Sequence, residues 1–220
     1  MRYHYLSHTL AADTPGYGGK KNISIKKDKS QDNGDSANTH MLSMSNHSGT
    51  HIDCPAHFFR NGRKISDYPA NYWFFKHPCV IKVQLGPSET LRLGEWCKKI
   101  KPQNDIVIFV SGWTKFRDKE KYVFRNPGIH PEAGLFLRKK CPKIRAIGID
   151  WISISPYENR VLGRESHMAF LNPNGKREPI LIIEDMKLSP KCLSLKELVV
   201  LPMIIKDLDG CPCTAIGRLS

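Results

Sequence analysis

The segment from His47 to Phe59 constrains this chain of 220 residues more than any other. It reads His-Ser-Gly-Thr-His-Ile-Asp-Cys-Pro-Ala-His-Phe-Phe, and its four odd-numbered polar residues are His47, His51, Asp53 and His57. Side chains of an extended strand alternate between two faces, so residues of one parity point the same way. A helix fits less well, because Pro55 opposes it and about 100° per residue separates His51 from Asp53 by roughly 200°. The spacing predicts that the four side chains converge.

Three imidazoles and one carboxylate in such a short segment are typical of a metal site. A single histidine usually has a structural or surface role, and coincidence explains one such residue easily. Four potential ligands of one parity are much harder to explain by chance. Imidazole and carboxylate ligands suit zinc, manganese or iron(II). We therefore expect a metal site built on this segment.

The bulk properties are those of an ordinary soluble protein. Hydrophobic residues make up 40% and charged residues 25% of the chain, and we expect residues 1–220 to form a single domain. No stretch approaches the about 20 apolar residues of a membrane helix, and the N-terminus lacks a secretory pattern. The seven scattered cysteines fit reduced thiols better than a disulfide framework. We expect a cytoplasmic protein without a membrane partner.

The formal net charge of +13 raises the question of a nucleic-acid partner. The basic residues are dispersed, however, and no aromatic platform or known nucleic-acid motif accompanies them. Two of the denser groups, at 98–101 and 138–140, fall at expected helix ends, where cations favour the helix dipole. We expect a solvated basic surface and no nucleic-acid partner. Attraction of an anionic substrate is a weaker alternative.

Apolar runs separated by polar breaks predict an α/β domain. We expect strands at 3–10, 39–45, 79–85, 105–110, 144–149 and 179–183, and helices at 91–100 and 131–140. Several strands lie close together near the N-terminus, which favours a mixed sheet over a regular doubly wound fold. The polar segment 20–38 is expected to be a mobile loop or an irregular hairpin, with a lid as one role.

The motif resembles the H-x-G-T-H-x-D-x-P-x-H pattern of the metal-dependent cyclase/hydrolase family, which includes bacterial kynurenine formamidase and isatin hydrolase. Every fixed position is present from His47 to His57. Other stretches also look like the family: Gly112-Trp113, 126–134, 146–150 and Asp209-Gly210. The resemblance implies a swivelling β/β/α-type α/β domain with a mixed, partly closed sheet. It also implies a homo-oligomer, a dimer or tetramer, for which the aromatic segment 68–75 is a candidate surface.

The resemblance extends the site beyond the motif. The family takes as metal ligands a histidine ahead of a short apolar turn and a glutamate that ends the following strand. Those positions match His167, expected after a loop at 155–166, and Glu184. The intervening loop 172–178 is longer than in many relatives, so Asp185 remains an alternative to Glu184. An aromatic residue of the first glycine-rich loop contacts substrate in the family, which makes Tyr17 the candidate here; an exposed loop tyrosine is the alternative.

The implied chemistry needs two divalent ions, zinc first and manganese second. His47, His51 and Asp53 would hold one ion, and His167 and Glu184 would hold the other. Asp53 would bridge the two ions, and Glu184 is a second candidate for a bridge. Such ions lower the pKa of a water from 15.7 to about 7, so that hydroxide is available to attack a carbonyl carbon. His57 is the expected proton shuttle to the leaving group, and a role as a further ligand is the alternative.

The expected function is therefore an arylformamidase-like, metal-dependent amidohydrolase. N-formylkynurenine is the leading substrate, which would place the chain in tryptophan catabolism. Hydrolysis of a cyclic amide such as isatin is the runner-up, followed by an uncharacterised cyclase reaction. A non-catalytic metal- or nucleic-acid-binding protein is the alternative from another class. Activity that disappears with chelation indicates a hydrolase, and a steep salt dependence of affinity indicates a nucleic-acid binder.

Overall fold

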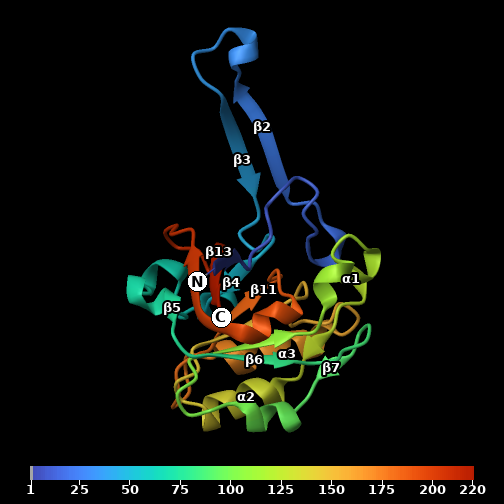
Figure 1. Ribbon diagram of the computed structural model, residues 1–220, viewed down its shortest axis with the longest axis vertical. Helices are drawn as coiled ribbons and strands as arrows, with labels where there is room; N and C mark the ends of the chain where they lie inside the picture. The colour runs from blue at the N-terminus through green and yellow to red at the C-terminus, as the bar shows by residue number, and fades with distance from the viewer. Residues whose placement is uncertain (1) are drawn as a thin grey trace.

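A nine-stranded mixed sheet organises the molecule (Figure 1). The structure is a computed structural model that describes residues 2–220. The strand order is β5 (Phe74–Phe75), β12 (Leu195–Pro202), β13 (Gly210–Leu219), β4 (His51–Asp53), β11 (Leu181–Glu184), β10 (Ala146–Ile149), β8 (Ile106–Val110) and β6 (Pro78–Lys82). Off this path, β1 (Arg2–Tyr5) pairs with β13. Strands β6 and β12 approach each other although they lie far apart in this order. The expected mixed, partly closed sheet is thereby confirmed.

Strand β4, which carries the central part of the histidine motif, joins two different halves of the sheet. Strands β6, β8, β10 and β11 are parallel, whereas β4 runs antiparallel to both of its neighbours, β11 and β13. The carboxyl end of β11 and the amino end of β4 therefore meet at one edge. The register pairs His51 with Glu184 and Asp53 with Gly210. Sheet pairing thus brings together residues that are distant in the sequence.

The core lies on both faces of this sheet. Strand β8 is fully buried, and its residues alternate between two apolar clusters. Ile106, Ile108 and Val110 belong to one cluster, and Val107 and Phe109 belong to the other. A strand covered on both faces needs apolar residues at every position, which explains its continuous apolar run. The expected strand at 105–110 is confirmed.

Three α-helices accompany the sheet: α1 (Glu120–Phe124), α2 (Pro131–Lys140) and α3 (Arg160–Leu171). Helix α2 spans the expected residues, with Pro131 at its first position and Glu132 in its first turn. Helix α3 packs against α2, and Phe170 is fully buried in the cluster that also contains Leu137. The expectation of a loop at 155–166 is wrong, because Asn159 caps α3 by accepting a hydrogen bond from the N–H of Leu162.

The helix expected at 91–100 is also absent. Leu91 instead belongs to β7 (Thr90–Leu91), which pairs in parallel with β9 (Gly128–Ile129). The backbone at Gly94 is extended, and only Glu95–Lys99 forms a short 3-10 helix, η6. Seven other 3-10 segments occur: η1 (Tyr17–Gly19), η2 (Gln31–Asn33), η3 (Pro55–His57), η4 (Ile65–Asp67), η5 (Ala70–Trp73), η7 (Trp113–Phe116) and η8 (Pro190–Ser194). Pairing between distant strands outweighs the local helical spacing of the apolar residues.

Most other expected strands are present with shifted ends. The expected strands at 79–85, 144–149 and 179–183 correspond to β6, β10 and β11. The first strand is shorter than expected, since β1 ends at Tyr5 and only an isolated bridge from Ser7 to Met186 follows. No helix within residues 2–220 has both the length and the apolar character needed to cross a membrane.

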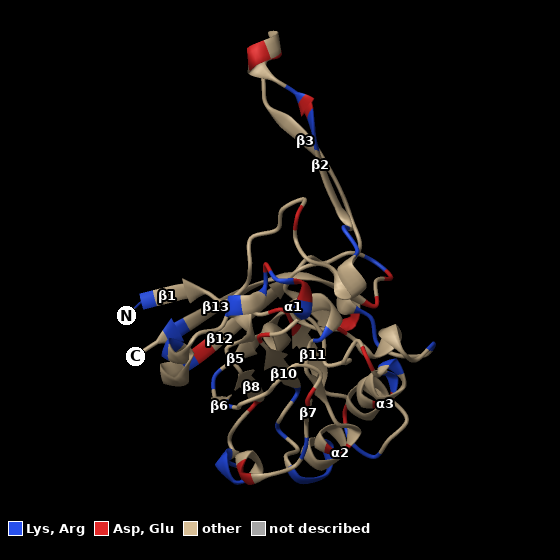
Figure 2. Ribbon diagram, turned by 90° about the vertical axis from the view of Figure 1, so that its right-hand side faces the viewer, with Lys and Arg blue, Asp and Glu red and all other residues tan. Residues whose placement is uncertain are grey.

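A long ribbon projects away from the body of the protein (Figures 1 and 2). It consists of β2 (Ile23–Lys29) and β3 (Thr39–Met44), paired antiparallel with a register shift near Lys27. Of the two expectations for 20–38, the hairpin is correct, and β3 confirms the strand expected at 39–45. Ile25 and Leu42 are directly paired and therefore share one face of the ribbon, where they are 45% and 50% exposed.

The aromatic segment 68–75 contributes to the core more than to the surface. Tyr68, Trp73 and Phe75 are buried, whereas Phe74 is about half exposed. Tyr68 and Trp73 also contact each other with ring centroids 5.6 Å apart. The segment therefore does not offer the broad aromatic surface that its sequence suggested.

Candidate metal and active site

The four polar residues of the histidine motif line one cavity of about 300 Å³. His51 and Asp53 lie on β4 two residues apart, so strand alternation places them on one face. His47 lies in the bend before β4, and His57 ends η3. The structure therefore brings all four residues together, although the extended-strand explanation holds only for the two on β4.

Two glycines allow this close arrangement. Gly49 has φ of +61°, a left-handed conformation, and a Cβ there would lie 2.3 Å from Cδ2 of Leu10. Gly210 lies beside Asp53 in the register, and a Cβ there would lie 2.6 Å from Cε1 of His47. The turn between His47 and β4 and the close approach of β13 to His47 therefore both depend on glycine.

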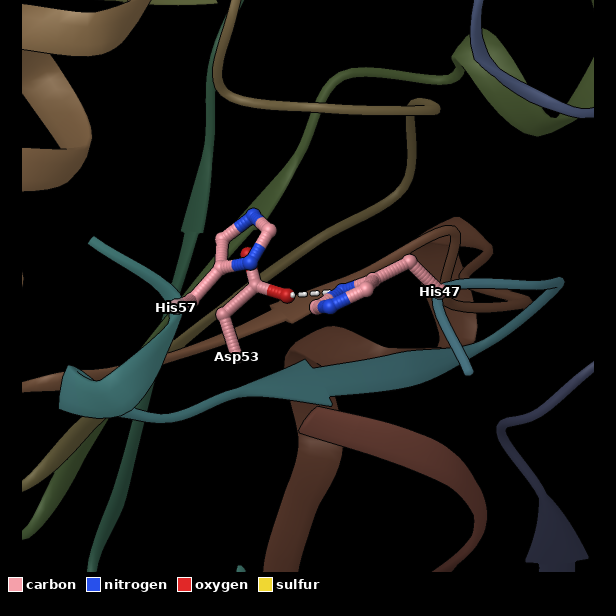
Figure 3. A group of neighbouring side chains, drawn as sticks. All are labelled: His47, Asp53 and His57. Carbon is pink, nitrogen blue, oxygen red and sulfur yellow. Dashed lines mark hydrogen bonds and ion pairs between the residues drawn. The ribbon is translucent and has the colours of Figure 1, made fainter. Parts of the chain in front are cut away.

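Asp53 lies at the centre of the cluster and is 1% exposed. Its Oδ1 lies 2.8 Å from Nδ1 of His47 and 3.4 Å from Nε2 of His51 (Figure 3 shows the contact with His47). Its Oδ2 lies 3.5 Å from Nε2 of His167. Burial would raise the pKa of Asp53, but its contacts with His167, His47 and His51 hold it well below its ordinary range. Asp53 is therefore an anion whose two oxygens face different sets of imidazoles.

His51 and His167 are oriented in the same way. The Nδ1–H of His51 donates to the carbonyl oxygen of Gly49 at 2.8 Å, and that of His167 donates to Gly163 at 2.8 Å. Because a carbonyl oxygen only accepts, Nδ1 of each ring carries a proton, and Nε2 is the atom left for a metal. Burial lowers the pKa of His167, but Asp53 and Glu184 raise it to about 10, so these carboxylates favour a cation at Nε2. Both Nε2 atoms face Asp53. A backbone acceptor that fixes the tautomer in this way is typical of histidines that bind a metal.

The structure also distinguishes Glu184 from Asp185. The hydroxyl of Ser153 and the N–H of Ile154 donate to Oε1 of Glu184, at 3.0 and 2.7 Å. Oε2 of Glu184 then lies 3.5 Å from Nε2 of His51, and Oε1 lies 3.6 Å from Nε2 of His167.

The Asp185 carboxylate has other partners. The guanidinium of Arg117 donates to both of its oxygens, and the hydroxyl of Tyr122 donates to Oδ1. These contacts leave Glu184, rather than Asp185, facing the histidines.

Asp209 is a site residue that the sequence analysis did not identify as a candidate ligand or catalytic group. Its Oδ2 lies 2.9 Å from Nε2 of His47 and 2.6 Å from Nδ1 of His57. These two histidines hold the pKa of the Asp209 carboxyl well below its ordinary range. Burial lowers the pKa of His47, but Asp209 and Asp53 outweigh it and raise the pKa to about 10. In the sequence, only the Asp-Gly pair at 209–210 pointed to this residue. The contact of Asp209 with the two histidines depends on the pairing of β13 with β4, which the sequence does not reveal.

The donor set fits divalent cations. Potential ligand atoms of His47, Asp53 and His57 lie within 4.8 Å of one another, and so do those of His51, Asp53 and Glu184. The two groups share Asp53, which fits a bridging carboxylate. Membership of His57 in the first group keeps both of its expected roles open, further ligand and proton shuttle. The accumulation of carboxylates that favours imidazolium at His47 also favours a bound dication.

Aromatic side chains form part of the cavity wall. The Phe58 ring stacks on His167 with centroids 4.7 Å apart. Tyr17 lines the same cavity, and its hydroxyl lies 3.4 Å from Oγ of Ser155. The rings of Tyr17 and Tyr157 pack edge to face, with centroids 5.6 Å apart. Tyr17 is therefore a wall residue of the cavity, and its contact with a substrate remains a prediction.

Known proteins resemble this chain over nearly its whole length. The model of a family described as "Cyclase: Putative cyclase" matches residues 5–156. Kynurenine formamidase of Bacillus mycoides (strain KBAB4) is 28% identical over 222 residues, which cover 97% of this chain and 95% of that protein.

Solved structures share the fold. Isatin hydrolase A from Labrenzia aggregata, bound to benzyl benzoate, has a TM-score of 0.77 at 21% identity and covers 99% of this chain and 93% of its own. A protein described as a predicted metal-dependent hydrolase from Bacillus stearothermophilus has a TM-score of 0.73 at 18% identity, with coverages of 98% and 97%. The mixed α/β fold of this chain is therefore the isatin hydrolase-like fold.

Proposed function

The chain belongs to the family described as Putative cyclase, and from that premise we propose that it is a metal-dependent hydrolase that cleaves an amide-type C–N bond. The observation that carries the proposal is the buried Asp53 carboxylate, which has histidine nitrogens on both of its oxygens. N-formylkynurenine is the specific substrate in our proposal, since kynurenine formamidases are relatives along nearly the whole chain.

Five residues would hold two divalent ions, zinc in our proposal and manganese as the alternative: His47, His51, Asp53, His167 and Glu184. Such ions would lower the pKa of a water and polarise a carbonyl oxygen. Within this set, the backbone carbonyls of Gly49 and Gly163 fix the tautomers of two histidines. Ser153 and Ile154 fix the Glu184 carboxylate. The protein thus orients its donor atoms before any ligand arrives.

His57 is the catalytic proton donor in this proposal. It lines the cavity, and its Nδ1 contacts Asp209, which orients the ring and leaves Nε2 to face a substrate. Protonation of the departing nitrogen is the step that an amine leaving group requires. Asp209 acts through His57 and is therefore a positioning residue. Phe58 and Tyr17 would contact the aromatic ring of the substrate.

Hydrolysis of a cyclic amide such as isatin is the second candidate. The supporting observation is the structural likeness to isatin hydrolase A, which extends along 99% of this chain. The two reactions share attack on an amide carbonyl and differ in whether the amine product separates. A non-catalytic metal- or nucleic-acid-binding protein, or an uncharacterised cyclase, has no comparable observation in its favour.

A direct assay of both substrates tests the proposed function. Zinc- or manganese-loaded protein should release formate from N-formylkynurenine faster than it opens isatin. A chelator should abolish the rate, and added metal should restore it. Preferential opening of isatin would favour the second candidate. Absence of metal-dependent turnover with either substrate and with simple aryl formamides would contradict the proposal.

We further propose that the protein forms a homo-oligomer, a dimer or tetramer, and that the β2–β3 ribbon takes part in the contact. A two-stranded hairpin alone is at best marginally stable in water. The paired Ile25 and Leu42 side chains expose an apolar face on the projecting ribbon. A second copy that covers this face would stabilise the ribbon by burying apolar surface.

Leu42→Lys should therefore lower the mass measured by light scattering to that of the 25.1 kDa monomer at micromolar concentration. Met41→Lys is the matched control, because Met41 is also exposed and its side chain points to the opposite face of β3. A monomeric wild-type protein would contradict the oligomer. An oligomer that survives Leu42→Lys would exclude the apolar face of the ribbon from the contact.

A further inference from the structure

Two arginines of α3 line the same cavity as the candidate metal ligands. Arg160 and Arg164 lie seven and three residues before His167, at the i, i+4 and i+7 positions of one helical face. At 1.5 Å of rise per residue, they lie roughly 10 and 5 Å from His167 along the helix axis. Both arginines are exposed, whereas His167 is buried beside Asp53. The positive charges of this helical face therefore lie at the exposed end of the cavity, and His167 lies at its buried end.

Neither arginine is neutralised by a carboxylate. Within residues 2–220, neither Arg160 nor Arg164 has an acidic partner within 4.0 Å. Five other arginines do have one: Arg92, Arg117, Arg125, Arg145 and Arg218. The guanidinium carbon of Arg160 lies 4.4 Å above the ring of Tyr157, which also contacts Tyr17 of the cavity wall. An aromatic face holds a guanidinium in place and leaves its N–H donors free.

The charges inside the cavity determine how an anion would lie. Asp53 and Glu184 lie at the buried end among the histidines that would hold the metal ions, and the amide carbonyl has to reach that end to be hydrolysed. The unpaired guanidinium groups lie at the open end. A substrate that carries one carboxylate and one amide is therefore favoured with the carboxylate outward and the amide inward. The net charge of +13 adds a general attraction for anions.

We propose that Arg164 and Arg160 form a carboxylate subsite at the open end of the cavity and make the enzyme prefer an acid over the corresponding ester. This proposal rests on the hydrolase function proposed above and adds the residues that bind the carboxylate of the substrate. A guanidinium presents a planar pair of N–H donors that matches the two oxygens of a carboxylate. A cavity of about 300 Å³ lies at the lower end for small-molecule sites and suits one ring with a short side chain.

A matched pair of compounds tests the subsite: ortho-formamidobenzoyl propanoate and its methyl ester, which have nearly the same shape but differ by one charge. Arg164→Ala should raise KM for the acid about tenfold, the equivalent of one lost charge-assisted hydrogen bond, and leave KM for the ester unchanged. The double variant Arg160→Ala/Arg164→Ala should raise KM for the acid further. Arg164→Lys should recover part of the affinity, because it keeps the charge and loses the planar donor pair.

Arg177→Ala is the control, because Arg177 is exposed and lies outside the cavity lining. This substitution removes the same charge as Arg164→Ala. It should change neither KM. Equal KM values for the acid and the ester in the wild-type protein would overturn the proposal. An increase of the same size for both compounds in Arg164→Ala would overturn it as well.

Calorimetry with the corresponding amine products separates this proposal from the hydrolase function. The wild-type protein should bind aminobenzoyl propanoate more tightly than its methyl ester, and Arg164→Ala should abolish that difference. Absence of turnover together with this binding difference would contradict the hydrolase and support the subsite. Turnover of both compounds without the binding difference would support the hydrolase and overturn the subsite.

Discussion

Replacing Asp53 with alanine should remove metal from both proposed positions at once and reduce turnover by more than about 10³-fold. The reason is the placement of its two oxygens. Oδ1 faces His47 and His51, whereas Oδ2 faces His167. Both groups of potential ligand atoms within residues 2–220 include Asp53. Losing any one histidine removes a ligand from one position, but losing Asp53 removes negative charge from both.

The measurement is metal content and rate on the same preparation. Wild-type protein should carry about two divalent ions per chain, as expected for a two-metal hydrolytic site. Asp53→Asn is a useful second variant, because it keeps the size of the side chain and removes its charge. Asp118→Ala is the matched control, since Asp118 is an exposed carboxylate paired with Lys119. Circular dichroism of each variant separates loss of metal from loss of fold.

Unchanged metal content in Asp53→Ala would contradict the assignment of the bridging carboxylate. Loss of only one ion would be equally informative. It would mean that one of the two positions holds its ion without help from Asp53. The proposed sharing of one carboxylate between two ions would then be wrong.

The sequence predicted the location of the site better than its geometry. His51 and Asp53 share a face because they lie two residues apart on β4, as their spacing indicated. His47 and His57 reach the same cavity by other means, a left-handed turn at Gly49 and the 3-10 helix η3. A short motif can therefore identify residues that converge even where the conformation inferred from its spacing is only partly correct.

Contacts that depend on strand register were beyond the reach of the sequence. Asp209 joins the site because β13 pairs with β4 and places Gly210 opposite Asp53. No local periodicity links position 209 to position 53, and β13 was not predicted at all. Arg160 and Arg164 were missed for a related reason. Their alignment with His167 requires α3, and the segment before His167 was expected to be a loop.

The absent helix at 91–100 shows the opposite error. Leu93, Trp96 and Ile100 have helical spacing, yet Leu93 is exposed and Leu91 is held in β7 by its pairing with β9. The spacing was real, but the partner strand lies almost forty residues away in the sequence. Long-range pairing, which one sequence does not reveal, decided the structure there.

His57→Ala should retain both metals and lower kcat by about 10²- to 10⁴-fold, the usual contribution of a general acid–base group. His57 lines the cavity, and its Nδ1 lies 2.6 Å from Oδ2 of Asp209. A carboxylate behind an imidazole orients the ring. Such a histidine is suited to deliver a proton to a departing amine.

Metal content separates this role from the alternative. The ring of His57 lies beside that of His47, with centroids 4.1 Å apart, and both belong to one group of potential ligands. If His57 binds metal, His57→Ala should lose an ion together with its activity. His77→Ala is the control, because His77 is exposed and only its backbone is used in hydrogen bonds. It should change neither metal content nor rate.

The dependence on the leaving group provides the sharper test of His57. An amine made less basic by a para-nitro group needs less protonation as it departs than one carrying a para-methoxy group. His57→Ala should therefore impair hydrolysis of para-methoxyformanilide more than that of para-nitroformanilide. Equal losses for both substrates, with metal retained, would contradict proton donation to the leaving group. They would instead place His57 at an earlier step that both substrates share, such as orientation of the attacking water, because that step does not involve the departing nitrogen.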